Sequence, residues 1–128
     1  MKDNSYYLDK DNKYYNKIMD SIKKGNKKSL YHLRKYYVRE ITEGLCPTLT
    51  ANMGLGGHNV PFLLDEGRLR KLTENECARL QGLWDDEFEF PETVVKTHRY
   101  VQIGNAVTVP VIEQLAREAA AHLKRLRG

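Results

Sequence analysis

The segment from Cys46 to Pro61, CPTLTANMGLGGHNVP, gathers side chains that could read the edges of nucleic-acid bases. Its small polar groups are hydroxyls, amides and an imidazole, from Thr48, Thr50, Asn52, His58 and Asn59. Such groups donate hydrogen bonds to base edges in a DNA groove or accept them from these edges. Thr48 and Thr50 are two residues apart, so in an extended chain both hydroxyls point to the same side.

Three glycines, Gly54, Gly56 and Gly57, lie within four positions of the same segment. Glycine loses more conformational freedom on folding than any other residue, so this density implies an ordered role. The glycines permit left-handed conformations and let another backbone come close. Neither the phosphate-loop nor the dinucleotide-binding pattern is present. The alternative is a glycine-rich hairpin connection, in which His58 is an ordinary surface histidine.

Positive charge is concentrated at the start of the chain. The first 40 residues hold eleven Lys and Arg but only five Asp and Glu, whereas the rest hold ten and twelve, and the net charge is +4. A basic end favours an anionic partner, and nucleic acid is the commonest. A solvated lysine-rich helix is the alternative.

Two elements must carry this charge. The periodicity predicts an amphipathic helix over residues 12–24. From residue 30 to residue 39 the period changes to two, and Arg34, Lys35 and Arg39 alternate with tyrosines. We expect one strand with one face packed and the other facing DNA. The same pattern fits the edge of an ordinary two-faced sheet.

Residues 70–82, RKLTENECARLQG, predict a short helix that is fixed at both ends. Thr73 is the expected N-cap, and Glu76 three residues later completes a capping box. Gly82 can adopt the left-handed conformation that ends a helix. On physical grounds alone, this pattern describes a well-capped surface helix.

Turn residues and periodicity predict the remaining elements. Extended segments over residues 60–64 and 69–72 flank a turn, and residues 85–99 form an acidic connector. Residues 100–107 form a turn in which a glycine allows a sharp reversal. The last helix begins at Thr108 or Val109, and its apolar stripe is too wide for a small domain to cover easily.

Three of these stretches together resemble the C-terminal part of the DNA cytosine-5 methyltransferases of bacterial restriction-modification systems. Residues 70–82 resemble the ninth motif of that family, and residues 46–61 resemble the DNA-reading segment of its target recognition domain. Residues 100–110, YVQIGNAVTVP, are similar to the tenth motif. The three occur in the order and spacing of the family and together cover roughly residues 36–123.

The resemblance implies an α+β fold: a small twisted β-rich recognition domain with short helices, ending in a C-terminal helix that packs on a Rossmann-like catalytic domain. We expect residues 1–99 to form the recognition domain, including the ninth motif. Residues 100–128 would form the tenth-motif turn and the C-terminal helix.

The resemblance also implies roles for single residues. Arg70, with Thr73 and Glu76, would organise the recognition loops through multiple hydrogen bonds. Asn105 and Ala106 would line the pocket for S-adenosylmethionine, which is shared with the catalytic part. For Asn105, a simple Asx-type turn that needs no ligand is the alternative.

The chemistry of the family requires a cysteine thiolate that attacks the cytosine ring and a glutamate that supports it. These residues belong to a Pro-Cys and a Glu-Asn-Val segment, and neither string occurs in this sequence. Cys46 precedes a proline instead, and Cys77 lies in the capped helix. The two cysteines show no zinc-type spacing, and a disulfide framework is not expected.

We therefore predict the target-recognition portion or subunit of a DNA (cytosine-5-)-methyltransferase. It would act on duplex DNA together with a catalytic methyltransferase chain that carries the remaining motifs, and would be inactive alone. Its expected DNA-binding residues are Arg34, Lys35, Arg39, Thr48, Thr50, Asn52, Gly54, Gly56, Gly57 and His58, with the N-terminal lysines on phosphate.

The expected location is the cytoplasm, with no membrane partner, because no signal sequence or membrane-spanning apolar run is present. Two alternatives are a stand-alone, sequence-selective DNA-binding module and an inactive gene remnant.

Overall fold

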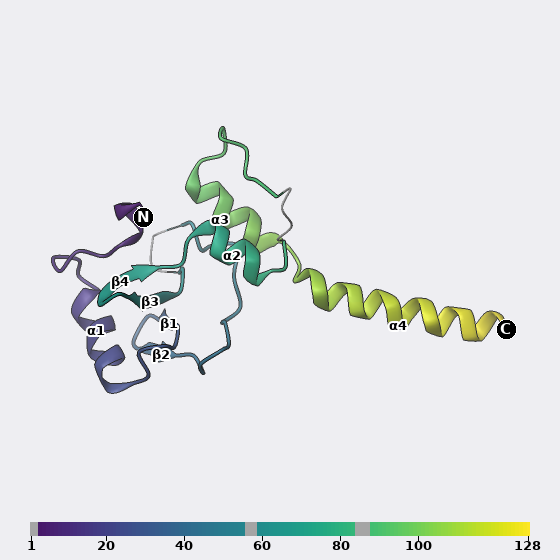
Figure 1. Cartoon of the computed structure of the whole chain (residues 1–128), viewed down its shortest axis with the longest axis horizontal. Helices are drawn as coiled ribbons and strands as arrows, with labels where there is room; N and C mark the ends of the chain where they lie inside the picture. The colour runs from purple at the N-terminus through teal and green to yellow at the C-terminus, as the bar shows by residue number, and fades with distance from the viewer. Residues whose placement is uncertain (1–2, 56–58, 84–87) are drawn as a thin grey trace.

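The computed structural model describes residues 3–55, 59–83 and 88–128 and has an α+β architecture (Figure 1). Four antiparallel strands form one sheet in the order β2-β1-β3-β4. The strands are β1 (Tyr31–Leu33), β2 (Val38–Glu40), β3 (Phe62–Asp65) and β4 (Arg68–Lys71). The helices are the 3-10 turn η1 (Asn4–Tyr6), α1 (Tyr15–Lys24), α2 (Glu74–Leu80), α3 (Lys96–Asn105) and α4 (Val109–Arg127).

Helix α1 packs beside β1 and β2, as Figure 1 shows. Ile18 and Ile22 are four residues apart, so they lie on one face of the helix, and both are fully buried. They form an apolar cluster with side chains from three strands, namely Tyr31, Leu33, Phe62 and Leu69. The predicted amphipathic helix is confirmed and begins three residues later than expected.

The single strand predicted over residues 30–39 is wrong, because the chain folds there into a hairpin. Strands β1 and β2 pair antiparallel, with Leu33 opposite Val38. Residues 34–37 make the reversal, closed by the Arg34 backbone N–H, which donates to the Tyr37 carbonyl oxygen at 2.8 Å. The alternating pattern runs through a turn that contains none of the usual turn residues, so periodicity alone does not reveal the break.

The hairpin of β3 and β4 follows the prediction, with its first strand displaced by one or two residues. Glu66 and Gly67 have φ angles of 49° and 81°, the conformation of a two-residue type I′ connection. Strand β4 leads directly into α2, where Thr73 and Glu76 form the predicted capping box. Gly82 has a φ of 73°, as expected for the residue that ends this helix.

Helix α3 corrects the prediction of a connector over residues 85–99 and a turn from residue 100. The helix starts at Lys96 and continues through Gly104 to Asn105. It crosses the domain boundary expected between residues 99 and 100. Tyr100 and Ile103 share one face and are buried against Leu72, Cys77 and Ala78, together with Leu49, Met53 and Val60, in a second apolar cluster.

Helix α4 extends away from the rest of the molecule (Figure 1). None of its nineteen residues is buried, although Val111, Leu115 and Leu123 are apolar and more than half exposed. Among the described residues, no helix combines the length and the apolar character that crossing a membrane requires.

Candidate functional site

A cleft of about 650 Å³ is lined by residues of the β1–β2 hairpin and of the segment that follows it. The lining includes five of the predicted DNA-binding residues, namely Arg34, Arg39, Thr48, Thr50 and Asn52. A sixth, Lys35, lines an adjoining hollow together with Arg34. The predicted residues Gly56, Gly57 and His58 lie outside the described residues.

Residues 48–53 expose three polar side chains and bury two large apolar ones. Thr48, Thr50 and Asn52 are exposed, whereas Leu49 and Met53 are buried in the second apolar cluster. The Thr50 hydroxyl donates to Asn52 Oδ1. Anchoring by the buried pair therefore presents the polar groups toward the cleft.

Two glycines let residues 50–54 lie directly on helix α3. A Cβ atom added to Gly54 would approach the carbonyl oxygen of Thr97 to well under 3.0 Å, and one added to Gly104 would do the same with the carbonyl oxygen of Thr50. Real Cβ atoms do not come so close, so only glycine fits at either position. Gly54 therefore has one of the predicted roles of the glycines, since it lets another backbone come close. Gly104 lies inside α3 and not at the predicted turn.

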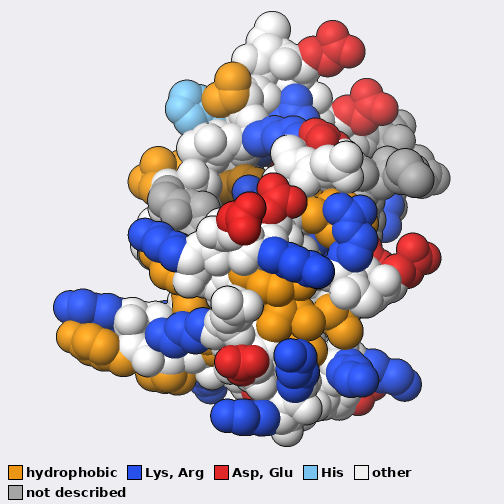
Figure 2. Space-filling view, turned by 90° about the vertical axis from the view of Figure 1, so that its left-hand side faces the viewer, with side chains coloured by type: hydrophobic (Ala, Val, Ile, Leu, Met, Phe, Trp, Pro, Cys, Tyr) orange, Lys and Arg blue, Asp and Glu red, His pale blue; other side chains and the backbone are white. Residues whose placement is uncertain are grey.

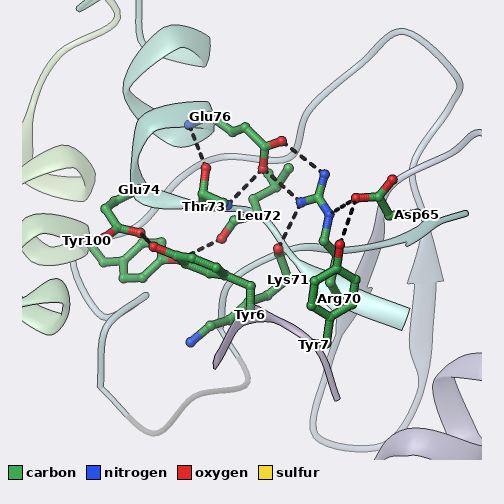
Figure 3. Close-up of polar contacts among 10 residues, drawn as sticks. All are labelled: Tyr6, Tyr7, Asp65, Arg70, Lys71, Leu72, Thr73, Glu74, Glu76 and Tyr100. Carbon is green, nitrogen blue, oxygen red and sulfur yellow. Dashed lines mark hydrogen bonds and ion pairs between the residues drawn. The ribbon is translucent and has the colours of Figure 1, made fainter. Parts of the chain in front are cut away.

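Arg70 is a buried arginine at the centre of a polar network that joins the β3–β4 turn to α2 (Figure 3). Its Nε donates to Asp65 Oδ2 at 2.5 Å, and its Nη1 and Nη2 donate to the two carboxylate oxygens of Glu76 at 2.9 and 3.0 Å. Nη1 also donates to the carbonyl oxygen of Lys71. Burial by itself would lower the pKa of Arg70, but the hydrogen bonds to Glu76 and Asp65 raise it overall.

Glu76 belongs to this network and to the helix cap at once. It accepts a hydrogen bond from the Thr73 backbone N–H at 2.8 Å, while the Thr73 hydroxyl accepts one from the Glu76 backbone N–H. Arg70 is only 3% exposed, so the network fixes a charge inside the fold. We name Arg70, Asp65, Thr73 and Glu76 the Arg70 network.

Hydrogen bonds from two buried tyrosines form a second polar contact, which links η1, α2 and α3. The Tyr6 hydroxyl donates to Glu74 at 2.5 Å, and the Tyr100 hydroxyl donates to the Leu72 carbonyl oxygen at 2.6 Å (Figure 3). Arg99 lies 3.8 Å from Glu74. Burial raises the pKa of both tyrosines well above the ordinary value, so both remain protonated donors.

The sequence did not reveal this contact, because its partners are up to 68 residues apart. A signal was nevertheless present, since Tyr100 and Ile103 have the spacing of one helical face.

Gln81 is a further residue that the sequence did not single out. Its buried side chain donates from Nε2 to the carbonyl oxygens of Ile103 and Ala106, and its Oε1 accepts from the Thr108 hydroxyl at 2.7 Å. Gln81 thereby holds the stretch that contains Asn105, whose own side chain is exposed.

Ala106 is half-buried and borders a hollow of about 480 Å³ with Gly104 and Thr108. Asn105 does not line this hollow, so the structure brings only Ala106 of the two predicted cofactor-binding residues to it. The described residues alone do not enclose a cofactor, because bound cofactors are usually buried over most of their surface.

The two cysteines are free and have raised pKa values. Burial raises the pKa of Cys46 to about 11, and burial places that of the fully buried Cys77 higher still. Reactive cysteines have lowered pKa values, so neither thiol is prepared for nucleophilic attack. Within residues 3–55, 59–83 and 88–128, no group of three or more His, Cys, Asp or Glu side chains is placed to hold a metal ion.

The face that carries α1 is rich in positive charge. Figure 2, which views the molecule from the left-hand side of Figure 1, shows Lys and Arg side chains spread over this face, with apolar side chains and some Asp and Glu side chains between them. Lys13, Lys17, Lys23 and Lys24 of this region are all exposed. The positive surface therefore extends beyond the cleft.

The family model described as C-5 cytosine-specific DNA methylase matches residues 2–121. The type II methyltransferase M.Bsp6I of Bacillus sp. (strain RFL6) is 41% identical over 116 residues, which is 91% of this chain and 36% of that protein.

Other matches cover less than half of this chain. M.NlaX of Neisseria lactamica is 44% identical over 54 residues, and M.MspI of Moraxella sp is 41% identical over 59 residues. These alignments cover 42% and 46% of this chain and 16% and 13% of the two relatives. The chain thus spans about a third or less of the length of these relatives, and no solved structure matches it.

Proposed function

This chain belongs to the family of C-5 cytosine-specific DNA methylases, and from that membership we propose that it is the target-recognition part of a DNA (cytosine-5-)-methyltransferase. It acts on duplex DNA together with a catalytic part that carries the Pro-Cys and Glu-Asn-Val segments, which are absent from these 128 residues.

The observation that carries the proposal is the cleft. Two arginines from the β1–β2 hairpin and three polar side chains from residues 48–52 line one concave surface. Positive groups neutralise phosphates, whereas hydroxyls and amides discriminate base edges. The cleft therefore combines both kinds of group that sequence-selective DNA binding requires.

Each group has a defined task in the proposed reaction. Thr48, Thr50, Asn52 and Arg39 read bases, and Arg34, Lys35 and the N-terminal lysines hold phosphates. The bound duplex is thereby positioned so that the target cytosine can leave the base stack and enter the catalytic part.

Asn105 and Ala106 form one wall of the pocket for S-adenosylmethionine, and Gln81 holds that wall in place. The cofactor supplies the methyl group for carbon 5 of cytosine. The nucleophilic cysteine comes from the catalytic part, because the described thiols here have raised pKa values.

Helix α4 is the proposed contact with the catalytic part. Its exposed Val111, Leu115 and Leu123 repeat at helical spacing, and its other faces carry charge. An apolar stripe of this length is normally buried against a partner.

The decisive test is co-expression of this chain with the catalytic part, followed by an assay of methyl transfer from labelled S-adenosylmethionine to duplex DNA. Activity is expected only when both parts are present. A folded chain that stays inactive with the catalytic part supplied would overturn the proposal.

A stand-alone DNA-binding module is a second candidate, because Arg34, Arg39, Thr48, Thr50 and Asn52 already bring phosphate-binding and base-reading groups into one cleft. Size-exclusion chromatography of the isolated chain separates the two. A monomer that binds one duplex sequence favours the module, whereas self-association that the catalytic part relieves favours the methyltransferase.

A further inference from the structure

The β1–β2 hairpin ends in two exposed tyrosines. Tyr36 and Tyr37 are 78% and 56% exposed, and Tyr36 is the most exposed large hydrophobic side chain among the described residues. Most tyrosines of the described chain are tied to the fold, such as Tyr6, Tyr31 and Tyr100, which are buried. Burying a large aromatic ring contributes substantially to stability, so two adjacent exposed rings need another explanation.

The tip is ordered. The Arg34 N–H to Tyr37 oxygen hydrogen bond closes the turn, and Leu33 pairs with Val38 immediately behind it. The rings therefore project from a short hairpin of defined register.

Positive charge surrounds the rings. Arg34 and Lys35 precede them in the turn, and the Lys35 ammonium lies 5.1 Å from the centre of the Tyr36 ring. Arg34 lines both the cleft and the adjoining hollow, so the tip is continuous with the cleft. Aromatic faces beside basic groups suit nucleic acid, because the rings stack on bases while the cations bind the neighbouring phosphates.

We propose that the Tyr36–Tyr37 tip is a separate DNA contact that stacks on unpaired bases, with Lys35 and Arg34 on the flanking phosphates. This inference rests on the proposed function, since it takes duplex DNA as the ligand of the cleft. It assigns the tip to bases that have left the stack, whereas the cleft reads paired ones. Every base has an aromatic face, so the tip contributes affinity without sequence preference.

The test compares two duplexes by fluorescence anisotropy at fixed salt. The first is fully paired, and the second has the same sequence with one unpaired base. The unmodified 128-residue chain should bind the second duplex more tightly. The double variant Tyr36→Ala/Tyr37→Ala should lose roughly 5- to 100-fold in affinity for the unpaired duplex and much less for the paired one.

Two further variants make the result specific. Tyr36→Phe/Tyr37→Phe keeps both rings and should retain the preference for the unpaired duplex. Leu126→Ala removes an equally exposed apolar side chain that also lies between basic residues but far from the cleft, and should change neither affinity. Thermal melting should be unaffected in all variants, because none of the replaced side chains is buried.

The outcomes distinguish a failure of the proposed function from a failure of the tip assignment alone. If the unmodified chain binds neither duplex, alone or with the catalytic part supplied, the proposed function fails, and the tip assignment fails with it. If the unmodified chain binds but the double alanine variant keeps its preference for the unpaired duplex, only the tip assignment is overturned.

Discussion

The Arg70 network and the cleft use the same kinds of side chain for opposite purposes. In the network, the guanidinium of Arg70 is 3% exposed and bonds to two carboxylates and a backbone carbonyl. In the cleft, Arg34 and Arg39 are exposed, as are Thr48, Thr50 and Asn52. An arginine whose hydrogen bonds are satisfied internally holds the fold together, whereas an exposed one is available to a ligand.

The difference predicts where substitutions act. Changes in the network should lower the free energy of unfolding, and changes in the cleft should alter DNA binding while leaving stability nearly unchanged. Four substitutions or measurements test this contrast.

Arg70→Ala should have the largest effect, about 3 kcal/mol of stability, because it leaves two carboxylates without their buried partner. Arg68→Ala is the matched control on the same strand, where the arginine is exposed, and should cost less than about 1 kcal/mol. Urea unfolding of the two variants measures both. Similar losses in the two would remove the distinction between buried and exposed arginines.

Gly104→Ala should cost about 2 kcal/mol, because its Cβ would collide with the Thr50 carbonyl oxygen. It should also reduce the ratio of affinities for a preferred over a scrambled duplex, since residues 50–54 must shift. Gly67→Ala introduces strain at a φ of 81° with no atom within 4 Å, so it should destabilise the fold without changing that ratio. An unchanged ratio in Gly104→Ala would show that the contact with α3 does not position the cleft residues.

Arg34→Ala should change stability by less than about 0.5 kcal/mol. It should weaken binding to all duplexes by a similar factor and reduce the slope of log affinity against log salt by about 1, as expected for one lost phosphate contact. Titrations at several salt concentrations measure the slope. A loss confined to one DNA sequence would instead identify Arg34 as a base-reading residue.

The smallest effect concerns the Cys46 thiol in the wall of the cleft. A pKa of about 11, raised by burial from 9.0, leaves roughly a hundredth of the usual thiolate at pH 8. Alkylation by iodoacetamide should therefore be slow at pH 8 and should keep accelerating as the pH rises toward 11. Mass spectrometry measures the alkylation rate at each pH. A rate that levels off near pH 9 would contradict the raised pKa of Cys46.

Local signals made much of the fold predictable. The capping box at Thr73 and Glu76, the Glu66-Gly67 turn and the apolar spacing of α1 all act within a few residues. The β1–β2 hairpin was missed because its turn, Arg-Lys-Tyr-Tyr, contains no glycine, proline, asparagine or aspartate.

Helix α3 was missed for a different reason. Gly104 disfavours a helix locally, but Tyr100 and Ile103 are buried, and the carbonyl oxygen of Thr50 occupies the space beside Gly104. Tertiary packing here overrides local propensity. The grouping of Thr48 and Thr50 could be predicted from sequence spacing, whereas the long-range partners of Gln81 and Glu74 could not.

The contact between residues 50–54 and α3 has one more consequence. At both of its ends, a glycine meets a backbone carbonyl, and every amino acid supplies the same carbonyl. The side chains at positions 48, 50 and 52 can therefore be replaced without disturbing the backbone contact between residues 50–54 and α3. A combinatorial library randomised at these three positions should retain the fold and yield variants that select different DNA sequences.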